Sequence, residues 1–280
     1  MNNNFAVFII THNRPNQQYT YELLRKNNYT GKIYFVLDDS DESVDVYKKL
    51  YGEDNIIIFH KANNFYLADN LTGLDKVPVY ARNESFKIAK DLGLSYFLQL
   101  DDDYIKIDYR YQCNNELKRA AVKNFDTLFS CMCEFLKLPY IYCLAFGVDG
   151  DFIGGKDSKY KEHLVQNARN SFFCKVDFPF DFLGRINEDV TTPLYYNTIG
   201  KLFLTILDVD ITLLNHADNS GGSTEQYKYT NTYWNYFYPI LFLPNCVTIK
   251  NTKNGEYIKS ISWNNALPKI ISGRFKKYEK

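Results

Sequence analysis

The spacing of apolar residues predicts that strands and helices alternate over the first half of the chain. Continuous apolar runs are typical of strands that are buried on both faces of a parallel sheet. Such runs occupy residues 5–10, 32–37, 55–59 and 96–100. Between them, helices are expected that end near Lys26, cover residues 44–50 and run from Pro78 to about Gly93. This layout fills roughly the first 105 residues and is typical of a mononucleotide-binding half of an α/β domain.

The second half of the chain has a less regular pattern. We expect an amphipathic helix over residues 116–137 and another helix that opens at residues 187–190 and runs to about Gly200. The other expected elements are strands at 140–146, 170–176 and 201–206, loops at 147–155 and 215–224, and an aromatic helix at 225–238. No internal repeat and no low-complexity linker divides the sequence, so we expect a single domain over residues 1–280.

Charge and hydropathy narrow the classes of partner. The 33 basic and 33 acidic residues give a formal net charge of zero, so a nucleic acid would have to bind through a local basic patch. No uncharged apolar run reaches the ~18 residues of a membrane-spanning helix, and the N-terminus lacks the features of a signal peptide. We therefore expect a cytoplasmic protein without a membrane partner. The six cysteines show no CxxC spacing, so we expect ordinary reduced thiols and no structural zinc.

Three consecutive carboxylates, Asp101, Asp102 and Asp103, follow the last apolar run of the first half directly. Open α/β sheets bind ligands at this end of their strands. Adjacent carboxylates repel one another unless a cation neutralises them, and Mg²⁺ or Mn²⁺ suits their oxygens while leaving coordination sites for a diphosphate. If the chain stays extended, Asp101 and Asp103 point to one side and Asp102 to the other. The alternative is an aspartate-rich surface turn.

Polar residues also follow the first two expected strands. The loop that contains Thr11, Asn13 and Arg14 leads into a helix, where backbone N–H groups and one cation suit a nucleotide. Asp38 and Asp39 end the second strand, a place where carboxylates commonly bind a ribose or the edge of a pyrimidine. An ordinary polar loop is the alternative interpretation of the first segment.

Three features further along the chain add candidate chemistry. Arg82 lies on the helix before the aspartates and would stabilise the charge of a leaving diphosphate, unless it is simply an exposed helical arginine. Glu188 and Asp189 open a predicted helix, either as a cap or with one of them as a general base for a hydroxyl group. His216, in a segment rich in glycine, is a candidate metal ligand or phosphate contact, or a structural histidine.

Taken together, these positions resemble the pattern of GT-A glycosyltransferases. The matching segments are Ile10–Pro15 (ITHNRP), Asp38–Asp39, Ala81–Asn83 and Asp101–Asp103, and Glu188–Asp189 matches the acidic base motif of inverting family-two enzymes. Within this fold the sequence looks most like the TET-associated glycosyltransferases of phages and eukaryotes, to which the segment Gly184–Asp189 is also similar. The resemblance covers roughly residues 5–217.

The resemblance implies an α/β fold of GT-A type, with a Rossmann-like mixed sheet flanked by helices in a single domain. Residues 1–105 would form the nucleotide-sugar-binding half and residues 106–280 the acceptor-side half. It further implies a UDP-sugar donor, a Mn²⁺ or Mg²⁺ ion, and a hydroxyl acceptor, expected to be 5-hydroxymethylpyrimidine in phage DNA. The location would then be the host cytoplasm, and no obligate protein partner is evident.

The resemblance also assigns roles within the donor half. Asp103 is the expected direct metal ligand, with Asp101 and His216 as further ligands. Asp101 and Asp102, the loop residues Thr11, Asn13 and Arg14, the pair Asp38–Asp39, and Arg82 are the residues expected to bind the nucleotide sugar.

On the acceptor side, Asp189, or its neighbour Glu188, would take the acceptor proton if the reaction inverts the anomeric carbon. A retaining reaction needs no such base. A DNA surface would draw on Arg169, Lys175, Arg185 and the basic C-terminal tail.

Other functions remain open at the level of sequence. The acceptor can instead be a carbohydrate, a lipid or a protein. A metal-dependent nucleotidyl or phosphoryl transferase also uses carboxylates at strand ends. A nucleotide-binding module without catalysis is the third alternative.

Overall fold

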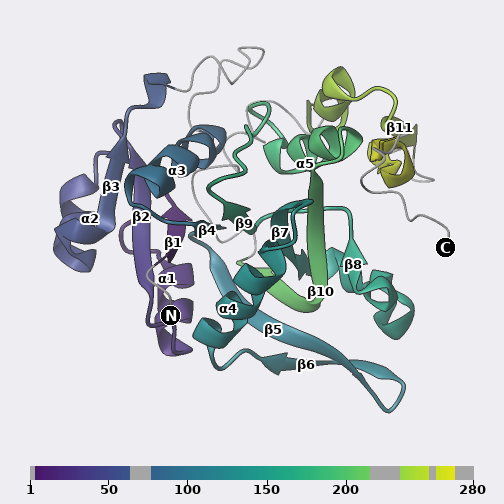
Figure 1. The fold of residues 1–280 in the computed structure, drawn as a ribbon, viewed down its shortest axis with the longest axis horizontal. Coiled ribbons are helices and arrows are strands. Elements are labelled where there is room, and N and C mark those ends of the chain that lie inside the picture. The colour runs from purple at the N-terminus through teal and green to yellow at the C-terminus, as the bar shows by residue number, and fades with distance from the viewer. Residues whose placement is uncertain (1–3, 64–76, 215–233, 252–256, 269–280) are drawn as a thin grey trace.

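A mixed β-sheet runs through the centre of the molecule and carries helices on its faces (Figure 1). The structure is a computed structural model that describes residues 4–63, 77–214, 234–251 and 257–268. Within these residues, ten strands form the sheet in the order β3-β2-β1-β4-β9-β7-β10-β5-β6, with β8 paired to β10.

The first four strands are parallel and confirm the pattern that the sequence predicts for this half. They are β1 (Phe5–Ile10), β2 (Lys32–Asp38), β3 (Ile56–Phe59) and β4 (Tyr96–Asp101), connected by α1 (Tyr19–Lys26), α2 (Val44–Tyr51) and, before β4, α3 (Val79–Asp91). In register, Ile10 of β1 lies beside Val36 of β2 on one side and Asp101 of β4 on the other. The carboxyl ends of these three strands therefore meet at one edge of the sheet, where parallel α/β sheets bind ligands.

Beyond β4 the sheet continues with strands from the second half of the chain. These are β9 (Phe172–Lys175), β7 (Ile141–Val148), β10 (Leu202–Leu213), β5 (Tyr104–Cys113) and β6 (Glu116–Ala121), with the short β8 (Leu164–Val165) beside β10. β9 is antiparallel to β4 and to β7, whereas β7 and β10 are parallel. One sheet thus includes strands from both halves, and the expected mixed α/β fold flanked by helices is confirmed.

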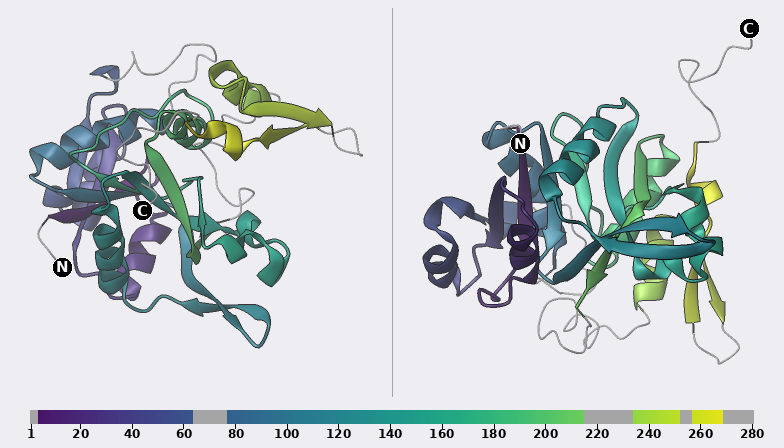
Figure 2. Two further views of the ribbon diagram at one scale, coloured as in Figure 1. Left: turned by 45° about the vertical axis from the view of Figure 1, so that its right-hand side comes forward. Right: turned by 90° about the horizontal axis from the view of Figure 1, so that it is seen from below.

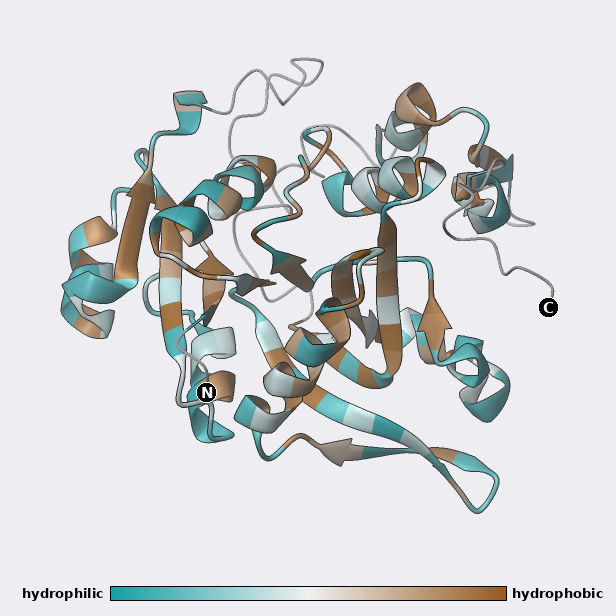
Figure 3. Cartoon of the chain, in the orientation of Figure 1, coloured by the Kyte–Doolittle hydropathy of each residue, from teal (hydrophilic) through white to brown (hydrophobic). Residues whose placement is uncertain are grey.

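Helices and apolar side chains cover both faces of this sheet. On one face, Leu24 of α1, Tyr47 of α2 and Phe129 of α4 (Phe125–Leu136) belong to one buried cluster. On the other face, Phe86 of α3 packs in a second cluster, at 5.0 Å from the ring of Phe97 on β4. Figure 3 shows the corresponding pattern, with apolar colour along strands such as β3 and both colours on helix α2. This two-sided burial explains why the parallel strands are continuous apolar runs.

The helix that we expected over residues 116–137 is wrong in its first part. Residues 116–121 form β6, which pairs with β5, a strand that the sequence analysis did not predict. The two strands are joined at Asn114 and Asn115, which both have a positive φ, as tight hairpin turns require. The helix α4 begins only after Asn124, whose side chain accepts a hydrogen bond from the backbone N–H of Thr127 at 2.9 Å. Pairing with β5 therefore overrides the helical pattern of residues 116–121.

The remaining elements of the second half agree with the predictions in type but differ in extent. β10 begins as expected and runs on to Leu213, seven residues beyond the predicted end at Ile206. The loop at 215–224 and the start of the aromatic helix lie outside the described residues, and residues 234–242 are helical. The loop expected at 147–155 holds two short 3₁₀ turns after the end of β7. The helix α5 (Glu188–Thr198) begins at the predicted position.

The C-terminal part of the described chain forms a separate hairpin of β11 (Val247–Asn251) and β12 (Tyr257–Ile261), followed by a short 3₁₀ helix, η7 (Trp263–Ala266). Figure 2 shows this hairpin on the opposite side of the molecule from β1–β3. Val247 and Ala266 pack with Val190 and Leu194 of α5 in a third buried cluster. The hairpin is thus anchored to α5. None of the described helices is long and apolar enough to cross a membrane.

Gly184 provides a test of how the segment before α5 is held. Its φ is +86°, and a Cβ on it would lie 2.5 Å from Cε1 of the fully buried Tyr238, whose hydroxyl accepts a hydrogen bond from Arg185 N at 2.9 Å. Gly184→Ala should therefore lower the free energy of unfolding by about 2–4 kcal/mol, from left-handed strain and overpacking together. The control is Gly93→Ala, because Gly93 also has a positive φ, +69°, but open space around it.

Gly93→Ala should lower the free energy of unfolding by only about 1–2 kcal/mol. Urea unfolding of both variants and of the natural protein measures these two losses in the free energy of unfolding. Equal losses for the two variants would show that Tyr238 does not restrict position 184.

Candidate active site

A cleft of about 910 Å³ lies at the edge of the sheet where β1, β2 and β4 end. Residues from both halves of the chain line it. Most of the side chains that the sequence analysis singled out are among them: Thr11, Arg14, Asp38, Arg82, Asp101, Asp102, Asp103, Glu188 and Asp189. The fold thus brings together residues that are up to 178 positions apart, from Thr11 to Asp189.

Three candidates are placed differently. Asn13 does not line the cleft; its side-chain oxygen accepts a hydrogen bond from Glu42 N at 3.0 Å, and its own N–H donates to the Asp41 carboxylate at 2.8 Å. Asp39 is also outside the cleft lining and lies 3.1 Å from His60 Nδ1. His216 lies outside the described residues.

Asp102 fastens the loop after β1 to the end of β4. Its carboxylate accepts a hydrogen bond of 2.6 Å from the Thr11 hydroxyl and one of 3.2 Å from Arg14 Nη1. Thr11 is held in turn by Gln18, whose Nε2 donates to the Thr11 hydroxyl oxygen at 2.9 Å. Because the chain turns directly after Asp101, the side-to-side alternation of an extended strand does not continue to Asp103. A buried hydrogen-bond network rather than strand geometry sets the direction of Asp102.

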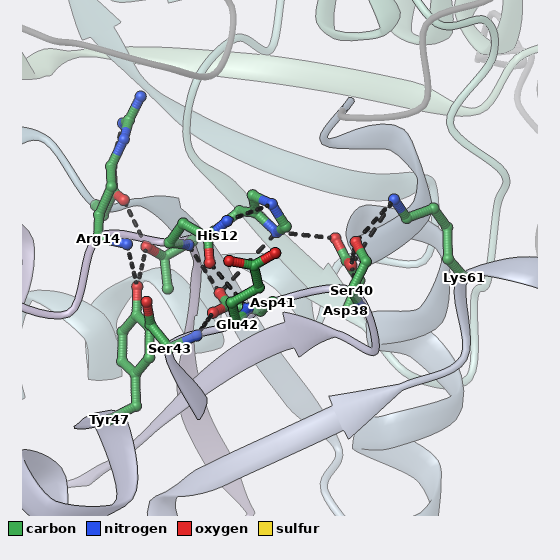
Figure 4. A network of polar contacts seen from close by, with 12 residues as sticks. His12, Arg14, Asp38, Ser40, Asp41, Glu42, Ser43, Tyr47 and Lys61 are labelled. Atoms are coloured by element: carbon green, nitrogen blue, oxygen red, sulfur yellow. Dashed lines mark hydrogen bonds and ion pairs between the residues drawn. The ribbon is translucent and has the colours of Figure 1, made fainter. Parts of the chain in front are cut away.

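The tyrosine of α2 completes this support. The hydroxyl of Tyr47 accepts a hydrogen bond from Arg14 N at 3.0 Å (Figure 4). It also lies 2.9 Å from the Thr11 hydroxyl. Burial raises the pKa of Tyr47, so that its hydroxyl stays protonated. The backbone around Arg14 is therefore fixed from two sides, by α2 and by the end of β4.

Asp38 is the carboxylate that the second strand brings to the cleft. His12 Nδ1 lies 3.2 Å from its Oδ2 and Lys61 Nζ lies 3.7 Å from its Oδ1 (Figure 4). Burial alone would raise the pKa of Asp38, but hydrogen bonds from His12 and Ser40 and the charge of Lys61 outweigh it and hold the pKa well below its usual range. Asp38 is therefore a carboxylate at any physiological pH and can accept hydrogen bonds from a ligand.

Arg82 joins the two halves of the site. This arginine of α3 is buried, and its Nη2 donates to Asp101 Oδ1 at 3.0 Å while its Nε donates to Glu188 Oε1 at 3.1 Å. Its guanidinium also lies 5.0 Å from the ring centroid of Phe172. Burial alone would lower the pKa of Arg82, but the charges of Asp101 and Glu188 raise it by more than burial lowers it. The pKa is therefore above its usual value, and the guanidinium keeps its charge. The alternative of an exposed helical arginine is excluded.

Three carboxyl groups of the cleft, Asp102, Asp103 and Glu188, have raised pKa values, and burial is the largest cause for each. Burial, together with the charges of Asp101 and Asp102, raises the pKa of Asp103 to about 7. Burial and the neighbouring charge of Asp189 raise the pKa of Glu188 to about 7, although Arg82 acts in the opposite direction. The cleft therefore concentrates negative charge that a bound cation would relieve.

The three aspartates do not form a metal cage by themselves. Asp101 is engaged by Arg82 and Asp102 by Arg14 and Thr11. Across the described residues, no group of three or more His, Cys, Asp and Glu side chains is arranged to hold a metal ion. A metal ion at this place would need ligands from the bound substrate or from other parts of the chain.

Several cleft residues were not predicted from the sequence. Lys259 and Trp263 reach the cleft from the C-terminal hairpin and the turn after it, and no motif around them in the sequence indicates a site residue.

The structure also tests the residues proposed to contact DNA. Arg169 lines the cleft, as a phosphate contact would require. The structure corrects two other proposed DNA contacts, because Lys175 and Arg185 are only 6% and 5% exposed. The Lys175 ammonium donates to the Leu138 carbonyl at 2.7 Å inside the fold. The basic C-terminal tail lies outside the described residues.

The sequence matches the model of the TET-associated glycosyltransferase family over residues 5–222. The chain belongs to this family. The match spans both the parallel half and the strands up to the end of β10, so it includes nearly all of the cleft except the C-terminal hairpin. The expected enzyme class, a glycosyltransferase, is thereby confirmed.

Three solved structures that match this chain are distant from it in sequence. The structure of S. aureus TarS is 14% identical over 75% of this chain and 36% of its own, with a TM-score of 0.44, so this chain spans about a third of its length. Glucosyl-3-phosphoglycerate synthase from Mycobacterium tuberculosis, in complex with Mn²⁺ and UDP-glucose, is 7% identical over 92% and 86%, with a TM-score of 0.48. GalNAc-T7 with UDP, GalNAc and Mn²⁺ is 14% identical over 85% and 48%, also with 0.48. The search of curated proteins found no match.

The raised pKa of Glu188 predicts how this glycosyltransferase responds to pH. Below the usual pKa of a glutamate, ~4.3, the residue is protonated in both the folded and the unfolded state. Between there and the folded pKa of about 7, only the folded state keeps the proton. The stabilisation that this proton provides is therefore complete at low pH and is lost as the pH rises to about 7.

Glu188→Gln removes this dependence. The free energy of unfolding of the natural protein, minus that of Glu188→Gln, should fall by about 1–3 kcal/mol between pH 5 and pH 8, as measured by urea unfolding. A difference that stays constant or grows with pH would contradict the raised pKa.

Proposed function

We propose that this glycosyltransferase moves a sugar from a UDP-sugar to the hydroxyl group of a 5-hydroxymethylpyrimidine in DNA, with Mn²⁺ or Mg²⁺ as cofactor. The observation that carries the proposal is the link through Arg82. It places Asp101, at the strand ends where a nucleotide diphosphate would bind, in one cleft with Glu188 and Asp189, where an acceptor hydroxyl would be deprotonated. The cleft volume of about 910 Å³ is within the usual range of ligand pockets, which is roughly 300–1,000 Å³.

The nucleotide would lie along the ends of β1, β2 and β4. Asp38, which stays ionised, would accept hydrogen bonds from the base or the ribose, and the fixed backbone around Arg14 would face the phosphates. Arg82 would stabilise the charge of the leaving diphosphate; its Nη1 is buried and makes no hydrogen bond among the described residues. These roles follow the family resemblance and agree with the side chains that line the cleft.

A divalent ion fits the carboxylate-rich end of β4. Asp103 would hold the ion, with Asp101 beside it, because both carboxylates line the cleft. Their negative charges repel each other, which is why the charge of Asp101 raises the pKa of Asp103, and a cation would relieve this repulsion. The N–H of Leu214, the last described residue before residue 215, donates to the Asp103 carbonyl at 3.0 Å. His216 would be a third ligand, as the family resemblance implies. When bound, the ion would neutralise charge on the leaving diphosphate.

The acceptor would approach from the side of α5. Asp189 would accept the proton of the attacking hydroxyl, and Glu188 would hold Arg82 in place or share that task. A base in duplex DNA cannot reach such a cleft, so the target would be flipped out of the helix or taken from a single strand. Arg169 and Lys159, which also line the cleft, would contact the flanking phosphates.

The direct test incubates the protein with UDP-sugars and Mn²⁺ in the presence of hydroxymethylated or unmodified DNA of the same sequence. We expect sugar on the hydroxymethylated bases alone, detected by mass spectrometry of the nucleosides, with release of UDP and loss of activity in EDTA. Absence of sugar from the modified DNA would overturn the proposed acceptor. Transfer to a carbohydrate, lipid or protein instead would reassign it, and release of pyrophosphate would indicate nucleotidyl transfer.

The proposed metal role predicts the effect of Asp103→Asn on donor binding. The affinity for UDP in the presence of Mn²⁺ should fall by more than the ~10–100-fold that is typical for residues outside the first coordination shell. Calorimetric titration with and without Mn²⁺ measures this effect, and Asp45→Asn, at an exposed position on α2 away from the cleft, is the control. Equal UDP affinity of Asp103→Asn and the natural protein in Mn²⁺ would rule out Asp103 as a metal ligand.

A further inference from the structure

The C-terminal hairpin forms one wall of the cleft, although it lies beyond the segment that matches the family. The family match ends at residue 222, whereas Lys259, Ile261 and Trp263 line the cleft. The hairpin and the turn that follows it are packed on α5, whose first residues are Glu188 and Asp189. The position of these residues relative to Glu188 and Asp189 is therefore fixed by a buried apolar contact.

Asn187 links the C-terminal hairpin to the proposed catalytic residues, because Lys259 of the hairpin hydrogen-bonds to it and Glu188 is the next residue in the chain. It precedes Glu188 directly and has left-handed backbone angles, with φ +55° and ψ +35°. Its side chain is held from two sides, because its Nδ2 donates to the Asn235 carbonyl at 2.9 Å and its Oδ1 accepts a hydrogen bond from Lys259 Nζ at 3.0 Å. Both partners come from beyond the family match.

The Lys259 ammonium is partly removed from water and lies among charged neighbours. Burial lowers the pKa of Lys259, and Arg169 adds to this effect, whereas the charge of Asp189 acts in the opposite direction. The ammonium thus interacts both with the side chain before Glu188 and with the carboxylate after it. A lysine that only covered the surface would keep its ammonium in water.

We propose that Lys259 is a positioning residue for glycosyl transfer: by holding Asn187, it fixes the turn that presents Glu188 and Asp189 to the acceptor. The C-terminal hairpin then completes the acceptor side of the site. Without the hydrogen bond from Lys259, only the bond to the Asn235 carbonyl still holds the Asn187 side chain, and the left-handed backbone, which asparagine adopts less readily than glycine, is less restrained. The first turn of α5 would then lose its fixed direction. The inference rests on the proposed role of Asp189 or Glu188 as the base.

The variants Lys259→Met, Lys259→Arg and Asn187→Gly test the proposal. Glycine at position 187 still allows the left-handed backbone but removes both side-chain hydrogen bonds, the one from Lys259 and the one to the Asn235 carbonyl. Lys250→Met is the matched control, because Lys250 is an exposed lysine on the neighbouring strand β11 and does not line the cleft. Transfer kinetics, UDP affinity and amide hydrogen exchange of residues 185–190 are measured for each.

We expect Lys259→Met to lower kcat at least tenfold while KM for the donor and UDP affinity change less than twofold. Lys259→Arg should recover part of the loss, and the double variant Lys259→Met/Asn187→Gly should be no slower than the slower single variant. Hydrogen exchange of residues 185–190 should become faster in Lys259→Met and not in Lys250→Met. This last measurement needs no substrate, so it remains decisive if the proposed acceptor proves wrong.

Three results would overturn the inference. The first is a natural kcat with unchanged hydrogen exchange in Lys259→Met. The second is a loss of UDP affinity in parallel with kcat, which would indicate general damage to the fold. The third is a double variant in which the two losses multiply, since Lys259 would then not act through Asn187.

Discussion

The site depends on one buried cation. The guanidinium of Arg82 is almost fully removed from water and lies between Asp101, at the end of β4, and Glu188, at the start of α5. A buried charge is costly unless it is paired and hydrogen-bonded, so the buried Arg82 needs both carboxylates as partners. Since β4 belongs to the parallel half and α5 to the second half, this constraint also fixes the relation between the two halves at the cleft.

The rest of the site is arranged around this link by similar buried contacts. Asp102 joins the loop after β1 to the end of β4 through Thr11 and Arg14. On the other side, Asn187 joins the start of α5 to the C-terminal hairpin through Lys259. The polar side chains that line the cleft are thus held by neighbours on rigid elements. Catalysis by electrostatic preorganisation requires such fixed charges.

The sequence predicts the parallel half well because both faces of its strands are buried, which leaves uninterrupted apolar runs such as residues 5–10 and 96–100. The hairpin of β5 and β6 was missed because it is largely exposed: no element was predicted over β5, and the polar residues of β6 also fit the helix expected over residues 116–137. The paired Asn114 and Asn115, both with a positive φ, were the local signal of its turn.

The site was predictable as separate groups but not as an arrangement. Arg82, Asp101 and Glu188 each have a chemical reason to be singled out, yet the contact between Arg82 and Glu188 spans 106 positions and follows from tertiary packing. The family assignment was predictable from short motifs and is confirmed over residues 5–222. Lys259 has no motif around it, and only the packing of β12 on α5 brings it to the cleft.

A double-mutant cycle on Arg82 and Glu188 tests the central claim most directly, and it needs no substrate. Urea unfolding of Arg82→Met, Glu188→Gln and the double variant at pH 8, where Glu188 is ionised in the folded protein, gives the coupling between the two side chains. The exposed pair Lys87–Asp91, 2.7 Å apart on the same helix, serves as the comparison. We predict a coupling of about 1–3 kcal/mol for the buried pair and a clearly smaller coupling for the exposed pair, which water screens. Additive losses for Arg82 and Glu188 would contradict the account.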